Sequence, residues 1–162
     1  MAINVLWILL WLPILSKVFQ LKLASTLMVF RRPLGVLMGT MALVHSGQYF
    51  MNEYVLLPWQ QAFWIWDGQI AFTAWGFLGL IIAIILTITS NNISLKFFGG
   101  KLWKWIHRSV YVLLIFTLLH VLFLKLPGVQ DSLPLMIAVF FPFVLYMIGK
   151  ILEWKGVKLR KG

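Results

Sequence analysis

The sequence predicts an all-α integral membrane protein, a helix bundle of about five transmembrane helices with its N-terminus outside and its C-terminus inside. Three observations predict this class. The 162 residues are 62% hydrophobic and only 11% charged, with a mean hydropathy of +0.94. A soluble domain of this length cannot bury so much apolar surface. The apolar residues also form long runs, and most of the basic residues lie between these runs.

Five apolar segments are predicted to span the membrane, at residues 2–16, 33–57, 69–90, 102–125 and 133–153. A span needs about 20 residues, and the last four segments reach that length. The first is shorter and contains Pro13. Either it extends past Lys17, or the following stretch, KVFQLKLASTLMVF, lies along the membrane surface as an amphipathic piece. No basic residue precedes the first run, which is unlike a signal peptide, so we expect an uncleaved helix.

The distribution of charge supports the count of five. With alternating loops, 13 of the 14 Lys and Arg residues fall on one side of the membrane, and only Lys125 falls on the other. Glu53, Asp67 and Asp131, three of the four acidic residues, lie on the side of Lys125. Positive residues accumulate on the cytoplasmic side, so this pattern predicts a cytoplasmic C-terminus, whereas four or six spans would scramble it. The net charge of +10 is thus explained by topology, and no separate basic domain suggests nucleic-acid binding.

Turn-forming residues agree with the predicted boundaries. Pro33 suits the first turn of a helix. Asn91-Asn92 and Gly99-Gly100 are predicted to bracket a cytoplasmic turn, and Pro127-Gly128 to form an outer turn. Tryptophans stand near both predicted membrane surfaces, as aromatic belts do, at positions 59, 64, 66, 103, 105 and 154. With no repeat and no linker, residues 1–162 are expected to form a single domain. The chain has no cysteine, which excludes disulfides and thiolate ligands.

The three histidines, His45, His107 and His120, all fall within predicted spans. A histidine inside a membrane is a functional-site hypothesis by default, because burying it unpaired is costly. The alternative is a neutral imidazole that is hydrogen-bonded across helices. No Asp or Glu accompanies them in mid-membrane, as a proton relay or a hard cation would require, and zinc needs three or four close ligands. Heme iron needs only one or two axial imidazoles, so heme is the favoured interpretation.

The depths of two histidines match. The predicted helices 33–57 and 102–125 both start on the cytoplasmic side, so they run parallel. His45 lies 13 residues beyond Arg32, and His120 lies 12 residues beyond Arg108. At 1.5 Å per residue, both lie roughly 18–20 Å from the cytoplasmic surface. This predicts that His45 and His120 are the two axial ligands of one heme.

His107 stands apart from this pair. It lies next to Arg108 near the inner headgroups. It is separated from His120 by 13 positions, which places the two side chains about 140° apart on an ideal helix. The two histidines therefore share a face only if the helix is locally distorted. On an undistorted helix, either they contact different cofactors or His107 is not an iron ligand.

Glycines leave a second ambiguity. Gly35 and Gly39 form a small-residue stripe leading to His45, and Gly76 and Gly79 form another on the helix 69–90. Such stripes most often allow helices to pack closely. They could equally let a flat macrocycle approach the backbone.

Several motifs carry a family resemblance. The run TSNNISLKFFGGKLWKWIHRSVYVLLIFTLLHVLF resembles the ferric reductase-like transmembrane domain family, and within it the MsrQ-type branch of heme-binding membrane subunits. That branch has an arginine pair followed by Leu-Gly and a helix with one histidine, matched here by RRPLG and His45. It continues with Thr-Ser, a glycine, a tryptophan, His-Arg and a histidine 13 positions later. The corresponding residues are Thr89-Ser90, Gly100, Trp103, His107-Arg108 and His120.

The resemblance covers roughly residues 30–125, and two departures qualify it. The family usually has six helices, whereas five are predicted here. The NADPH oxidase relatives carry two histidines on each of two helices, whereas the helix of His45 has one, with Arg32 and Pro58 near the positions where a second would stand. Only one level pair is complete, so one heme b is expected. A second heme would need another ligand or a partner subunit.

These observations predict a membrane b-type cytochrome subunit in the bacterial inner membrane that moves electrons across the bilayer. His107 would bind a second heme near the cytoplasm or contact a propionate, a flavin or a quinone. Basic residues would offer charge-assisted bonds to acidic groups there, namely Arg31, Arg32, Lys104 and Arg108. The sequence has no Gly-rich dinucleotide motif, so a separate redox protein, a complex or quinol is expected as donor or acceptor. The alternatives are an integral subunit of a larger complex, with or without heme, and a cofactor-free packing subunit or transporter half.

Overall fold

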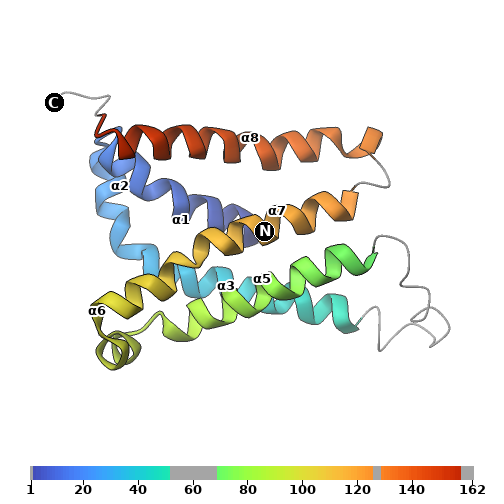
Figure 1. Ribbon diagram of the computed structural model, residues 1–162, viewed down its shortest axis with the longest axis horizontal. Coiled ribbons are helices and arrows are strands. Elements are labelled where there is room, and N and C mark those ends of the chain that lie inside the picture. Colours follow the sequence, from blue (N-terminus) through green and yellow to red (C-terminus); the bar gives the residue numbers. More distant parts are fainter. Residues whose placement is uncertain (1, 52–68, 126–128, 158–162) are drawn as a thin grey trace.

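The computed structural model describes residues 2–51, 69–125 and 129–157, and all of the regular structure within these ranges is helical (Figure 1). The elements are α1 (Ala2–Lys17), α2 (Lys22–Leu27), the 3-10 turn η1 (Met28–Phe30), α3 (Arg31–Phe50), α5 (Gln69–Thr89), α6 (Asn92–Arg108), α7 (Val110–Lys125) and α8 (Val129–Trp154). The predicted all-α class is confirmed for this part of the chain.

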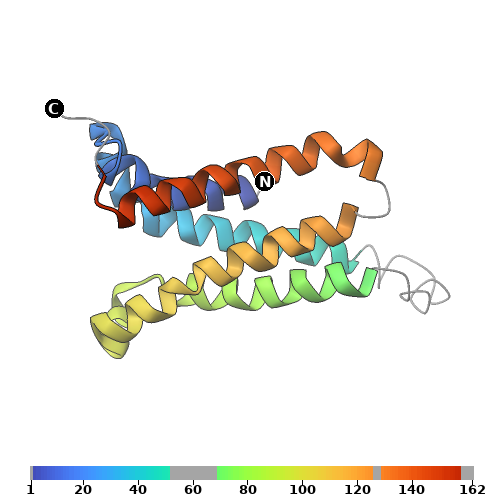
Figure 2. The ribbon, with the colours of Figure 1, turned by 45° about the horizontal axis from the view of Figure 1, so that its top comes forward.

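The long helices lie lengthwise beside one another and alternate in direction (Figures 1 and 2). The short helix α2, the start of α6 and the end of α8 gather at one end of the bundle, which we call the α2/α6 end. Helix α1 reaches this end from a starting point near the middle of the bundle. Consequently α3 and the α6–α7 pair run parallel, away from the α2/α6 end, and α5 and α8 return towards it.

Two described helical stretches are long and apolar enough to cross a membrane, Lys22–Phe50 and Asn92–Phe123. Two shorter apolar helices accompany them, Ile3–Lys17 and Thr73–Thr89. This is consistent with a helical membrane protein. The count of five spans and the orientation remain predictions.

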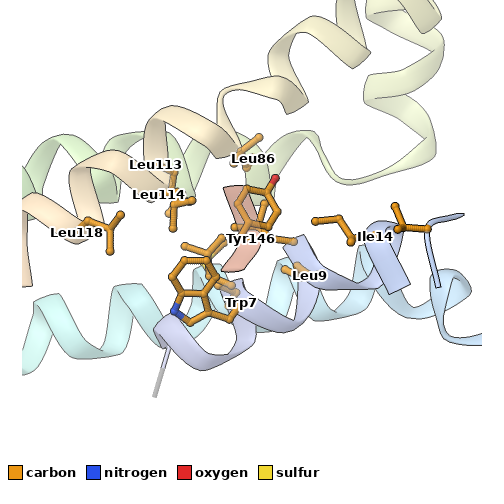
Figure 3. Close-up of a cluster of buried hydrophobic side chains, with 13 residues drawn as sticks. Trp7, Leu9, Ile14, Leu86, Leu113, Leu114, Leu118 and Tyr146 are labelled. Atoms are coloured by element: carbon orange, nitrogen blue, oxygen red, sulfur yellow. The ribbon is translucent and has the colours of Figure 1, made fainter. Parts of the chain in front are cut away.

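The buried core joins α1, α3, α5, α7 and α8 (Figure 3). Leu6 and Ile14 of α1 are among the most buried side chains, at 2% and 0% exposure. They belong to one cluster with Met38 of α3, Leu86 of α5 and further residues that include Leu113, Leu114, Leu118 and Tyr146. Among the side chains that the structure describes, this cluster includes much of α1, which lies in the part of the bundle nearer the α2/α6 end.

The structure contradicts one of the two predictions for the first connection. Helix α1 ends at Lys17, so the first segment does not extend further. The following stretch forms α2 and η1, whose side chains Leu23 and Val29 are 72% and 79% exposed. Short helical structure with exposed apolar side chains is consistent with the surface-lying alternative, which remains a prediction. Pro33 lies in the first turn of α3, as predicted.

The predicted turn between Asn91 and Gly100 is wrong in its interior, because α6 begins there. The Asn91 side chain caps this helix by accepting a hydrogen bond from Ser94 N at 2.7 Å. A kink interrupts the helix at Gly99, which has φ of 71°, a conformation that glycine adopts without steric cost. The sequence thus holds a capped short helix and a glycine bend where one turn was predicted. The predicted outer turn at Pro127-Gly128 and the tryptophans at positions 59, 64 and 66 lie outside the described residues.

Candidate functional site

His120 lies on α7 against the backbone of α5. A Cβ atom built on Gly76 of α5 would lie 2.7 Å from His120 Nδ1 and 2.9 Å from Cε1. The three His120 atoms nearest to that position are Nδ1, Cε1 and Cγ, so Nε2 is the ring nitrogen farther from Gly76. His120 follows the buried Leu113 by seven residues, or nearly two helical turns, and therefore lies on the core-facing stripe of α7.

His45 has the corresponding position on α3. It follows the buried Met38 by seven residues, so it also lies on a core-facing stripe. Its side chain is nevertheless exposed. Met38 is packed in the cluster that contains α1, whereas α1 begins only near the middle of the bundle (Figure 1). The core-facing stripe of α3 therefore continues, at His45, beyond the part that this cluster covers.

Helix α5 contacts both α3 and α7, so the depths of His45 and His120 can be compared through the α5 residues opposite them. Gly39 of α3 lies against Thr87 and Ala83 of α5. Counting six residues from Gly39 along antiparallel helices places His45 level with about residues 77–81 of α5. His120 lies at Gly76. The two histidines thus differ in depth by at most about one and a half helical turns, ~2–8 Å at 1.5 Å per residue.

His107 belongs to a separate cluster near the α2/α6 end. Its Nε2 lies 3.3 Å from Thr89 Oγ1, and its ring stacks on Trp103 with centroids 3.9 Å apart. Trp103 Nε1 donates a hydrogen bond to the Thr89 carbonyl at 2.9 Å. Thr89 Oγ1 donates its own proton to the Ile85 carbonyl at 2.7 Å. Thr89 can therefore only accept from His107, and this contact favours a proton on His107 Nε2.

Arg32 ties this cluster to α3. Its guanidinium lies 5.5 Å from the Trp103 ring centroid, and its Nη1 donates to Asn92 Oδ1 at 2.5 Å. Cations within about 6 Å of an aromatic face are attracted by it. The group of Arg32, Thr89, Asn92, Trp103 and His107, which we call the His107 cluster, therefore joins α3, α5 and α6. Arg108, predicted beside it, is exposed at the end of α6.

The helix is interrupted between His107 and His120. Helix α6 ends at Arg108 and α7 begins at Val110, with Ser109 N bonded to the Ile106 carbonyl three residues back. Both histidines contact α5, His107 at Thr89 and His120 at Gly76. The helix is thus locally distorted between His107 and His120. On the sequence argument, such a distortion is the condition for the two side chains to lie on one face. Within the described residues no group of three or more His, Cys, Asp or Glu lies together.

A family model described as "Ferric reductase like transmembrane component" matches residues 1–123. The chain belongs to this family. The resemblance predicted from the RRPLG and His-Arg motifs is thereby confirmed, and curated relatives support the MsrQ-type branch. No solved structure matches the chain significantly.

Three relatives illustrate the similarity. The protein-methionine-sulfoxide reductase heme-binding subunit MsrQ of Herminiimonas arsenicoxydans is 44% identical over 50 residues, 31% of this chain and 23% of the relative. That of Agrobacterium fabrum is 33% identical over 97 residues, 58% of this chain and 42% of the relative. The magnetosome protein MamZ of Magnetospirillum gryphiswaldense is 28% identical over 132 residues, 82% of this chain and 19% of the relative. The chain thus matches less than half of the length of each of these three.

The residues fit the heme that the family resemblance implies. An axial ligand must offer an imidazole nitrogen from a packed scaffold. His120 is half-buried with Nε2 on the side farther from Gly76, and His45 is exposed on a core-facing stripe. His107 fits less directly, because Thr89 engages its Nε2 and Trp103 covers one face of its ring.

Sequence reasoning missed the partners of the histidines. It noted Thr89 and Trp103 only as motif and belt residues, and it left the role of Gly76 open. A contact between α5 and α6 or α7 depends on helix rotation and register, which a single sequence does not reveal. The one available signal was the spacing of 13 residues from Gly76 to Thr89, which equals the spacing of His107 and His120.

Proposed function

We propose that this chain is a membrane b-type cytochrome subunit that transfers electrons across the bilayer, from a cytoplasmic flavin or quinol donor to an acceptor or a partner redox protein. The observation that carries the proposal is the placement of His45 and His120 on core-facing stripes of two parallel helices at similar depth. The names of the MsrQ relatives, which state heme binding and membership of a reductase, support it.

In this proposal His45 and His120 hold one heme b as axial ligands, and the heme supplies reversible one-electron chemistry. Basic side chains at the α2/α6 end attract acidic groups through charge-assisted hydrogen bonds, among them Arg31, Arg32, Lys104 and Arg108. The His107 cluster lies at this end, where electrons enter. A second heme, a flavin or a quinone at this cluster is part of the same proposal.

Electron transfer across the bilayer is tested in proteoliposomes with ferricyanide trapped inside and the impermeant reductant dithionite outside. We expect the purified protein to bleach the trapped ferricyanide, while empty vesicles and vesicles holding the His120→Ala variant stay coloured. If the heme is reduced but the trapped ferricyanide is not, transfer across the membrane is wrong.

His107→Ala is expected to leave the heme of His45 and His120 bound, because His107 lies at Thr89, 13 residues along α5 from Gly76. The substitution should slow heme reduction by the natural donor, since it removes the imidazole that stacks on Trp103 at the α2/α6 end, where electrons are proposed to enter. Stopped-flow absorbance at the Soret band measures the rate. Loss of all heme would make His107 a ligand of the single site, and an unchanged rate with unchanged heme would leave it only an interfacial residue.

We further propose five spans in the bacterial inner membrane, with the N-terminal end of α1 outside and the C-terminus in the cytoplasm. The support is that 13 of 14 Lys and Arg residues fall on one side under this count. A C-terminal green fluorescent protein fusion should fluoresce, and a C-terminal alkaline phosphatase fusion should be inactive. The opposite pair of results would reverse the topology and the assignment of His107 to the cytoplasmic side.

A further inference from the structure

The contact between His120 and Gly76 is a contact of an imidazole ring with a helix backbone. On Gly76 the three heavy atoms nearest to an added Cβ would be ring atoms of His120, at 2.7, 2.9 and 3.5 Å. On Gly39 the nearest atoms would be the Thr87 side chain, followed by the Ala83 carbonyl oxygen at 3.4 Å. On Gly79, one turn from Gly76, it would lie 3.6 Å or more from Leu113 and Phe116, an ordinary van der Waals distance. Gly76 is therefore the described glycine whose missing side chain makes room for an imidazole.

If a methyl group were added to Gly76, the neighbouring contacts would favour movement of the His120 ring over separation of α5 and α7. Trp75 and Phe116 lie on α5 and α7 with ring centroids 5.5 Å apart, next to Gly76 and one turn before His120. Gly79 is buried against Phe116 Cβ and Leu113 Cδ1. These contacts hold α5 and α7 together beside the histidine. A methyl group on Gly76 would thus displace the end of the His120 side chain, which can rotate, while the helix spacing is kept.

We infer that Gly76 is a positioning residue for His120: the absence of its side chain lets the imidazole lie against α5 with Nε2 as the nitrogen farther from Gly76. The inference rests on the proposed function, in which Nε2 binds heme iron. It assigns the ambiguous glycines of the sequence to two roles. Gly39 allows helix packing, and Gly76 sets the orientation of an axial ligand.

The test compares the Gly76→Ala variant with Gly79→Ala as the matched control on the same helix. Carbon monoxide binding to the reduced heme and the low-spin electron paramagnetic resonance signal report His120 ligation. A side chain forced about 30° from its rotamer loses roughly a factor of two to ten in equilibrium. We expect Gly76→Ala to shift the low-spin signal and to gain a carbon monoxide-binding fraction. Gly79→Ala should match the unmodified protein in both.

The outcomes separate the inference from the function. If the unmodified protein binds no heme, the proposed function fails. If it binds heme and Gly76→Ala has the same signal and no gain in carbon monoxide binding, only the positioning role fails. Should Gly76→Ala not fold, the double variant Gly76→Ala/His120→Ala decides. A folded double variant shows that the clash is with His120, and a misfolded one places it elsewhere and contradicts the inference.

Discussion

Replacing either His45 or His120 by alanine is expected to abolish the six-coordinate, low-spin heme spectrum. Both residues follow a buried core residue by seven positions, on helices that run parallel, and they lie within about one and a half turns in depth. In the proposed site the two imidazoles would ligate the same iron, so loss of either one would leave an open coordination position or release the heme. The effect is all-or-none in the absorption spectrum, which makes it the largest that we predict for a single substitution.

The measurement is heme content per protein together with the spin state, for both single variants after heme-replete expression. His107→Ala is the matched control, since it removes an imidazole from the neighbouring cluster and should retain the low-spin heme. A low-spin, six-coordinate heme in full amount in either His45→Ala or His120→Ala would contradict the pairing.

Gly39→Leu is expected to prevent stable packing of α3 on α5. Even a Cβ at Gly39 would overlap Thr87 Oγ1 and would lie 3.4 Å from the Ala83 carbonyl oxygen. Ala83 is 1% exposed, and Thr87 is held by its hydrogen bond to that carbonyl at 2.7 Å. Because the Thr87 side chain is held by this hydrogen bond and a leucine is much larger than a single Cβ, we expect the two helices to separate. Overpacking of this kind costs about 1–3 kcal/mol and occasionally more.

Gly35→Leu is the control on the same helix, because a Cβ there meets nothing within 4 Å. Thermal unfolding followed by circular dichroism in detergent should show a clearly lowered midpoint for Gly39→Leu and little change for Gly35→Leu. Adding Thr87→Ala to the smaller Gly39→Ala variant should restore part of the loss. Equal midpoints for the two leucine variants would refute close packing at Gly39.

The sequence predicted the helices well, because the length of an apolar run is a local property. The helical class and the correspondence of the apolar runs with α1, α3, α5, α7 and α8 agree with the structure. The helix inside the predicted 91–100 turn was missed. Asn91 can end one helix or cap the next, and Gly99 can bend a helix or end it.

The partners of the site residues could not be predicted, since they depend on how α5 is rotated against its neighbours. His107 was assigned to the interface from Arg108 and the tryptophans, yet its contacts to Thr89 and Trp103 come from two different helices. Likewise Gly39 and Gly76 look alike in sequence, and only the atoms opposite them distinguish a packing glycine from one that seats an imidazole.

The most direct test of the central claim is the dithionite-reduced minus oxidised absorption spectrum of the purified protein, with heme quantified as its pyridine complex. We predict a coloured protein with a Soret band, the sharp visible bands of a low-spin b-type heme and at least one heme per chain, the one that the proposed pair of axial imidazoles would hold. A colourless, folded protein after heme-replete expression would contradict heme binding and with it the proposed electron transfer.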